Sequence, residues 1–128
     1  MADTKILIVE DEGLVADDIK QTLGNLGYAV AGVVTSGEKA VIKATEIKPD
    51  LVLMDIGLRG YMDGIDAAQK IHDRLKIPVI YLTSYGDEGT VRRAMRTEPS
   101  RILSKPFNAD DLSAAIEWAL SQAEKGIK

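Results

Sequence analysis

The 128-residue chain contains no cysteine and only one histidine, His72. The absence of cysteine excludes disulfides, thiolate zinc sites and cysteine nucleophiles, and a single histidine excludes a metal site built on two histidines. No apolar stretch approaches the length of a membrane span, and no apolar run follows a basic start at the N-terminus. The sequence therefore predicts a cytoplasmic protein without membrane contact, in which His72 is a solvated surface residue.

Basic residues are also the minority among the charges. Against 20 Asp and Glu there are 16 Lys and Arg, which leaves a net charge of -4. This balance argues against direct nucleic-acid binding and favours basic partners or cations. The length suits one domain, which can bury about two-thirds of its unfolded surface without a disulfide or structural metal. We place that domain at residues 1–124, with 125–128 as a frayed tail or the start of a linker.

Short apolar runs separated by amphipathic segments predict an alternation of strands and helices. Continuous apolar runs at residues 6–9, 51–54 and 78–82 are typical of strands buried on both faces of a parallel sheet. Two weaker strands are predicted at residues 28–34 and 101–104, and the second of them suits a sheet edge.

The segments between these strands have helical spacing of their apolar residues. The first predicted helix carries Val15, Ile19 and Leu23 on one face and ends at Gly27. The fourth carries Val91, Ala94 and Met95. This fourth helix is predicted at residues 87–97. The second is predicted at residues 36–47 with Ser36 as its N-cap, the third at 64–75, and the fifth from Asn108 to about 123.

Five such β-α units require right-handed crossovers, which lay helices on both sides of the sheet. The sequence thus predicts an α/β fold, a doubly wound five-stranded parallel sheet with helices on both faces. In such sheets, ligands bind beyond the carboxyl ends of the strands.

Chemically active side chains follow four of the predicted strands, at Glu10 and Asp11, Asp55, Thr83 and Lys105. Several carboxylates directed into one crevice repel one another and favour a bound cation. Oxygen ligands without histidine or cysteine select Mg²⁺, with Mn²⁺ and Ca²⁺ as alternatives. With a lysine and a hydroxyl nearby, these residues suit a dianionic phosphoryl group, and a carboxylate can act as the nucleophile.

Two other phosphate-binding designs do not match the sequence. It contains neither a Gly-x-Gly-x-x-Gly loop nor a Walker loop, and the acidic turn after the first strand repels a nucleotide phosphate. Phosphatases with an aspartyl nucleophile normally carry a second aspartate two residues later, where this chain has Gly57.

Five short motifs in this order resemble the receiver domain of two-component response regulators, over nearly the whole chain from Ile6 to about Ala123. They are Ile8-Val9-Glu10-Asp11-Glu12, Leu53-Met54-Asp55-Ile56, Met62-Asp63-Gly64-Ile65, Tyr81-Leu82-Thr83-Ser84 and Lys105-Pro106-Phe107. The variant resembles receivers associated with sensor histidine kinases. The resemblance implies the flavodoxin-like strand order 2-1-3-4-5.

The resemblance also implies a role for each site residue. Asp55 is the expected phosphoacceptor, and Lys105 and Thr83 are expected to contact the phosphoryl group. The expected metal is Mg²⁺, bound by Asp55, by Asp11 directly, by Glu10 through water and by the Gly57 carbonyl.

The implied function is that of a regulatory phosphoprotein, not of an enzyme with its own substrate. A sensor histidine kinase or a phosphotransfer domain is the expected donor, and a downstream protein or a fused kinase domain the expected target. A homodimer through the last two β-α units is a further expectation.

Two alternatives stay open at this point. Ile102 occupies the position of the family's switch aromatic, which favours a receiver-fold interaction module that phosphorylation does not gate. A Mg²⁺-dependent phosphatase or phosphotransferase using Asp55 is the other.

Overall fold

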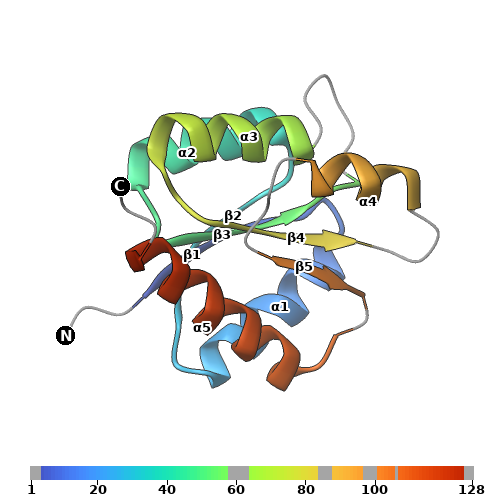
Figure 1. The fold of residues 1–128 in the computed structure, drawn as a ribbon. Coiled ribbons are helices and arrows are strands. Elements are labelled where there is room, and N and C mark those ends of the chain that lie inside the picture. Colours follow the sequence, from blue (N-terminus) through green and yellow to red (C-terminus); the bar gives the residue numbers. More distant parts are fainter. Residues whose placement is uncertain (1–3, 58–63, 84–87, 97–100, 106, 126–128) are drawn as a thin grey trace.

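The computed structural model describes residues 4–57, 64–83, 88–96, 101–105 and 107–125. Strands and helices alternate along these residues, as predicted (Figure 1). Their five strands are β1 (Lys5–Val9), β2 (Ala29–Val34), β3 (Leu51–Asp55), β4 (Val79–Thr83) and β5 (Arg101–Ser104). Their five helices are α1 (Gly13–Asn25), α2 (Gly37–Ile47), α3 (Gly64–Leu75), α4 (Glu88–Met95) and α5 (Ala109–Lys125).

The strands form one parallel sheet in the order β2-β1-β3-β4-β5. The central strands β3 and β4 are buried along their whole length, whereas β5 has exposed ends and partly buried middle residues. This confirms the predicted strand order and the predicted edge position of residues 101–104. The mixed composition of β5 suits an edge, because one side of an edge strand has no neighbouring strand.

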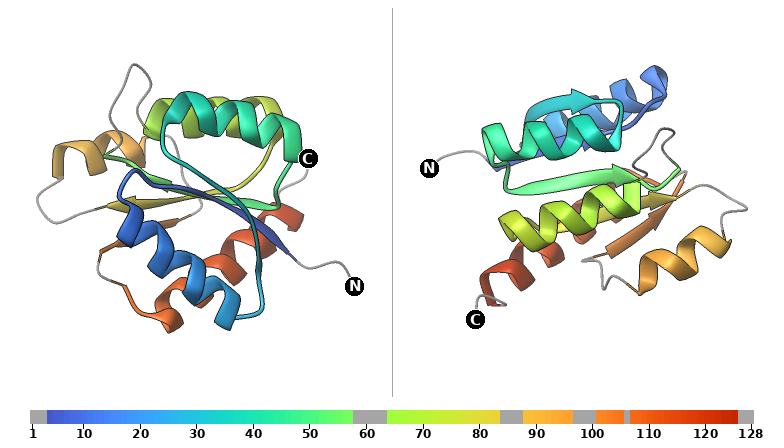
Figure 2. Two further views of the ribbon diagram at one scale, coloured as in Figure 1. Left: turned by 180° about the vertical axis from the view of Figure 1, so that it is seen from behind. Right: turned by 90° about the horizontal axis from the view of Figure 1, so that it is seen from above.

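Alternate side chains of each strand face opposite sides of the sheet and build two cores. In β1, Leu7 and Val9 pack under α2 and α3, with Ala94 of α4 in the same core. Ile6 and Ile8 pack on the other face against α1 and α5 (Figure 2). Helices therefore cover both faces, as a doubly wound fold requires. Within the described residues, no helix is both long and apolar enough to cross a membrane.

Local signals in the sequence set several helix boundaries. The Ser36 hydroxyl accepts a hydrogen bond from the Lys39 amide at 3.2 Å, and the Asn108 side chain accepts one from the Asp111 amide at 2.7 Å. Ser36 is thus the predicted N-cap of α2, and Asn108, where the last helix is predicted to begin, caps α5 in the same way. Gly27 follows the end of α1 with a φ of 93°, a conformation in which glycine lacks the penalty of a Cβ.

Three details of the predicted elements are wrong. Met95 is 61% exposed, while its neighbour Ala94 is fully buried. Successive helical residues are about 100° apart, so α4 directs Ala94 at the core and Met95 at solvent. Tyr28 precedes β2 because its amide donates to Leu23 O and closes α1. Pro78 lies just before β4, where its carbonyl still accepts from the Val52 amide.

Candidate functional site

The predicted site residues meet at the carboxyl edge of the sheet. Glu10 directly follows β1, and its amide extends the pairing with β2 by donating to Val34 O at 3.0 Å. Asp55 and Thr83 are the last residues of β3 and β4. Lys105 follows β5, and its amide donates to Thr83 O at 2.7 Å. The parallel direction of the strands brings these residues together from positions far apart in the chain.

Some residues of the sequence motifs cannot be placed at this edge. Met62, Asp63, Ser84 and Pro106 lie outside the residues that the structure describes.

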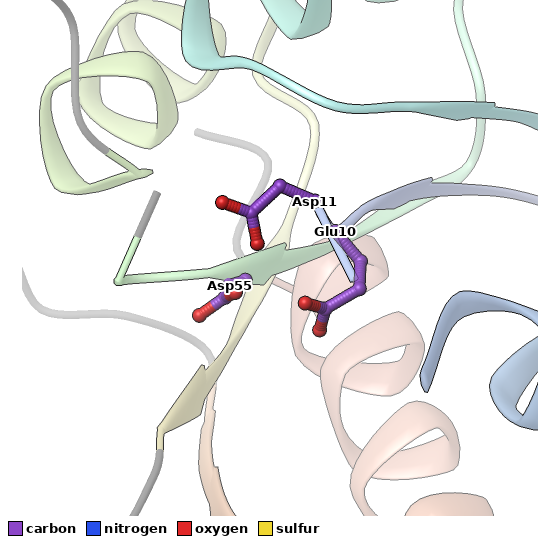
Figure 3. A group of neighbouring side chains, drawn as sticks. All are labelled: Glu10, Asp11 and Asp55. Carbon is purple, nitrogen blue, oxygen red and sulfur yellow. The ribbon is translucent and has the colours of Figure 1, made fainter. Parts of the chain in front are cut away.

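Three carboxylates form the acidic part of the site. Glu10, Asp11 and Asp55 each contribute one oxygen to a group whose members all lie within 4.8 Å of one another. Figure 3 shows the three side chains gathered beside the end of β3. Glu10 is 1% and Asp55 7% exposed, whereas Asp11 is exposed to solvent. A cluster of carboxylate oxygens, open to solvent on one side, has the donor set that hard divalent cations such as Mg²⁺ prefer.

Lys105 brings a positive charge to the buried side of this cluster. Its Nζ lies 2.7 Å from Glu10 Oε1 and 3.7 Å from Asp55 Oδ2, and its side chain is 15% exposed. Burial acts to lower the pKa of Lys105, but the hydrogen bond to Glu10 and the nearby carboxylate charges raise it overall. The ammonium is therefore held in its charged form, with its shorter contact to Glu10 and its longer one to Asp55.

Glu10 is the most buried of the three carboxylates. The pKa of Glu10 is raised to about 7, mainly by burial and also by the neighbouring Asp55, while Lys105 acts in the opposite direction. The Glu12 amide also donates to Glu10 Oε2 at 3.3 Å. Near neutral pH this carboxyl is poised between its two protonation states, and a bound cation would favour the ionised one.

The backbone at Gly57 fixes one oxygen of Asp55. The Gly57 amide donates to Asp55 Oδ1 at 2.9 Å, which leaves Oδ2 facing Lys105. The sequence motifs imply only a carbonyl ligand at Gly57 and not this amide donor. An aspartate two residues before a glycine is a common signal for such a local turn, so the hydrogen bond could have been predicted.

Thr83 and Ile102 lie on the last two strands, β4 and β5. Thr83 is 4% exposed at the end of β4. Ile102 pairs in register with Tyr81 of β4 and is partly buried against the core under α2 and α3. A β-branched side chain at this position has few rotamers, unlike the aromatic residue that the family places there. His72 lies elsewhere, on α3, with a side chain that is 61% exposed, as predicted.

The comparison with protein families agrees with this geometry. Residues 6–117 match the model of the response regulator receiver domain. The chain belongs to the receiver domain family. Its members are regulatory domains of two-component signal transduction, and the matched residues run from within β1 into α5.

Individual receiver domains resemble the chain over most of its length. The transcriptional regulatory protein PdtaR of Mycobacterium tuberculosis (strain CDC 1551 / Oshkosh) is 39% identical over 118 residues, which cover 92% of this chain and 57% of PdtaR. The signal receiver domain of a modulated diguanylate cyclase from Desulfovibrio desulfuricans G20 is 38% identical, with a TM-score of 0.92 over 98% of this chain and 99% of that one.

A third receiver carries a metal in its site. The receiver domain of the sensor histidine kinase PA1611 from Pseudomonas aeruginosa PAO1 has a magnesium ion coordinated in the active site cleft. It is 29% identical, with a TM-score of 0.84, over 94% of this chain and 99% of that one. By their names, these relatives include a transcriptional regulatory protein, a diguanylate cyclase and a sensor histidine kinase. The chain spans about half the length of the curated relatives it matches.

Proposed function

We propose that the chain is a phosphoacceptor that takes a phosphoryl group onto Asp55 and then changes its binding to a partner. The observation that carries this proposal is the setting of Asp55. Its carboxylate is buried, has Oδ1 held by the Gly57 amide and Oδ2 facing Lys105, and has two further carboxylates beside it. An exposed aspartate at a strand end would need none of these contacts.

The transfer is a single displacement at phosphorus. An oxygen of Asp55 attacks the phosphorus atom, and the bond from phosphorus to the donor atom breaks. The electron pair of that bond leaves with the donor, so the products are an acyl phosphate on Asp55 and the free donor. Asp55 can act as the nucleophile because the Gly57 amide and Lys105 orient its carboxylate. Slow hydrolysis of the acyl phosphate would return the domain to its starting state.

We infer that Mg²⁺ is the metal of this site, held by Glu10, Asp11, Asp55 and the Gly57 carbonyl. When bound, it supplies positive charge that offsets repulsion between the carboxylates and the phosphoryl oxygens. Glu10 and Asp11 hold the metal in this proposal, and Lys105 pairs with a phosphoryl oxygen. Thr83, buried at the end of the neighbouring strand, would contact a further phosphoryl oxygen and pass the change to α4.

The cellular setting follows from this chemistry and from the family. The expected donor is the phosphohistidine of a sensor histidine kinase or a phosphotransfer domain in the cytoplasm. The target is a downstream protein or a fused kinase domain. We place the domain at residues 1–124, and we expect its last two β-α units, which hold α4, β5 and α5, to form any homodimer contact.

The deciding experiment is intact mass measurement after incubation with acetyl phosphate, in Mg²⁺ or in chelator. We expect wild type to gain the mass of one hydroxylamine-labile phosphoryl group, only with Mg²⁺, and Asp55→Asn to gain none. Asp50→Asn is the matched control, because Asp50 is an exposed aspartate at the other end of β3. Labelling of Asp55→Asn at another residue would overturn the site assignment.

Ile102 supports a second candidate, a receiver-fold module whose output does not depend on phosphorylation. Its side chain is partly buried and β-branched, so it is poorly suited to rotate between two positions. A phosphoryl mimic at Asp55 that leaves partner affinity and hydrogen exchange of α4 unchanged would favour this candidate. A change in both would favour the phosphorylation-gated receiver.

A further inference from the structure

Gly64, the first residue of α3, packs against the backbone of Asp55. A Cβ at Gly64 would lie 2.9 Å from Ile56 Cα and 3.0 Å from the Asp55 carbonyl carbon, and closer still to Asp55 O. Cβ atoms essentially never come this close to other heavy atoms. The neighbouring atoms belong to the backbone, so they cannot rotate away as the end of a side chain could.

A glycine is needed at position 64 because there is no space for a Cβ, and not because the backbone has dihedral angles that only glycine adopts. Among the described glycines, only Gly27 has a positive φ, so the backbone of Gly64 is one that alanine can adopt. Gly13 provides the contrast, because it is the first residue of α1, as Gly64 is of α3, and a Cβ there would meet nothing within 4 Å. Alanine is favoured over glycine inside helices, yet only Gly13 has room for it.

A side chain at position 64 would force α3 and the end of β3 apart. Behind Gly64, the side chains of Ile65, Ala67, Ala68 and Ile71 are at most 2% exposed and anchor α3 in the core. On its other side, the Asp55–Ile56 peptide is joined to β4, because the Ile56 amide donates a hydrogen bond to Leu82 O at 3.1 Å. The peptide is therefore clamped between α3 and β4.

The contacts of the Asp55 carboxylate depend on this clamp. Asp55 Oδ1 receives the Gly57 amide at 2.9 Å, and Oδ2 lies 3.7 Å from Lys105 Nζ. A shift of a few tenths of an ångström in the Asp55 backbone changes both distances, and it also moves the carboxylate relative to Glu10 and Asp11.

We propose that Gly64 is a positioning residue for phosphoryl transfer. Because Gly64 has no side chain, α3 can pack directly against the Asp55–Ile56 peptide. This contact fixes the backbone of Asp55, so that its carboxylate lies between the Gly57 amide and Lys105. The proposal rests on the proposed function of Asp55. It assigns Gly64 no contact with the phosphoryl group.

The test compares wild type, Gly64→Ala and Gly13→Ala, first without metal. Hydrogen exchange of the Ile56 amide and the NMR resonance of the Gly57 amide report on the clamp. A stabilising osmolyte keeps a weakened variant folded. In Gly64→Ala, we expect Ile56 to exchange at least about tenfold faster and the Gly57 resonance to move, while Ile8 in the core of β1 stays within about twofold.

The same proteins are then labelled with acetyl phosphate in saturating Mg²⁺. We expect Gly64→Ala to be labelled about 10- to 100-fold more slowly than wild type, and Gly13→Ala to stay within about twofold in both measurements. Equal behaviour of the two variants overturns the proposal. So does a Gly64→Ala protein that is unfolded, or in which Ile8 exchanges as fast as Ile56, because the effect is then general. If wild type itself takes no phosphoryl group, the proposed function fails, whereas labelled wild type with normal Gly64→Ala refutes only the role of Gly64.

Discussion

The two aspartates at the ends of β3 show how the same type of side chain can have two different roles. Asp50, just before the strand, is exposed, and its Oδ2 accepts a hydrogen bond from the Lys5 amide at 2.8 Å. Asp55, the last residue of the strand, is 7% exposed, and its Oδ1 accepts one from the Gly57 amide at 2.9 Å. The hydrogen bonds are alike. Only Asp55 has Lys105, Glu10 and Asp11 around it, because active side chains gather at the carboxyl edge.

The two ends of the sheet therefore serve different purposes. At the amino end, the polar groups connect neighbouring strands and face water. At the carboxyl end, the ionisable side chains of Glu10 and Lys105 are largely buried. Their burial costs free energy, as the raised pKa of Glu10 shows. Proteins accept such costs where chemistry requires them.

The largest expected effect is on the pH dependence of stability without metal. The pKa of Glu10 is raised from 4.5 to about 7, so between these values the folded state holds a proton that the unfolded state has lost. Stability therefore falls as pH rises through this window, by roughly 3 kcal/mol from Glu10. Denaturant unfolding on either side of the window measures the loss. Glu10→Gln should remove it, and Asp50→Asn should not. Equal pH slopes in wild type and Glu10→Gln would contradict the prediction.

The next largest effect is expected on the labelling of Asp55, and it distinguishes Lys105 from a lysine at the amino end of the sheet. We expect Lys105→Ala to slow labelling of Asp55 about 100-fold, because a cation facing the phosphoryl group is lost. Mg²⁺ affinity, measured by calorimetry, should be equal or higher, since a competing positive charge is removed from Glu10. Lys5→Ala, at the exposed start of β1, is the control. Unchanged labelling of Lys105→Ala would remove this lysine from the mechanism.

A smaller effect is expected at Asp50. Asp50→Ala removes the acceptor for the Lys5 amide and should lower the free energy of unfolding by about 1 kcal/mol. Asp50→Asn keeps an acceptor oxygen and should recover most of this loss. Denaturant titration measures both variants, and labelling of Asp55 should not change. Slower labelling in Asp50→Ala would show that the two ends of β3 are coupled.

The smallest effect concerns the turns at the amino end. Lys48 and Lys76 follow α2 and α3 with positive φ values of 47° and 59°, a conformation that costs a residue with a Cβ about 1 kcal/mol or more. Lys48→Gly should therefore raise the free energy of unfolding by a few tenths to about 1 kcal/mol. Lys20→Gly, inside α1, should lower it by about 1 kcal/mol. If both variants changed the free energy of unfolding in the same direction, the explanation by the positive φ of Lys48 would be wrong.

The sequence by itself determined the order and type of the elements and the edge where the chemistry lies. Apolar runs and helical spacing reflect local geometry, so they located strands such as β3 and the apolar face of α3. Parallel strands place their carboxyl ends at one edge, which was enough to group Asp55 with Glu10, Asp11, Thr83 and Lys105.

Only the tertiary structure decided the contacts within that group. The shorter contact of Lys105 with Glu10 than with Asp55, and the burial that raises the pKa of Glu10, depend on how strands far apart in the chain pack together. The exposure of Met95 depends on the rotation of α4 about its axis. The contact of Gly64 with the backbone of Asp55 depends on where α3 meets the sheet. Periodicity in a sequence gives the faces of an element, but distances between elements arise only when all of them pack at once.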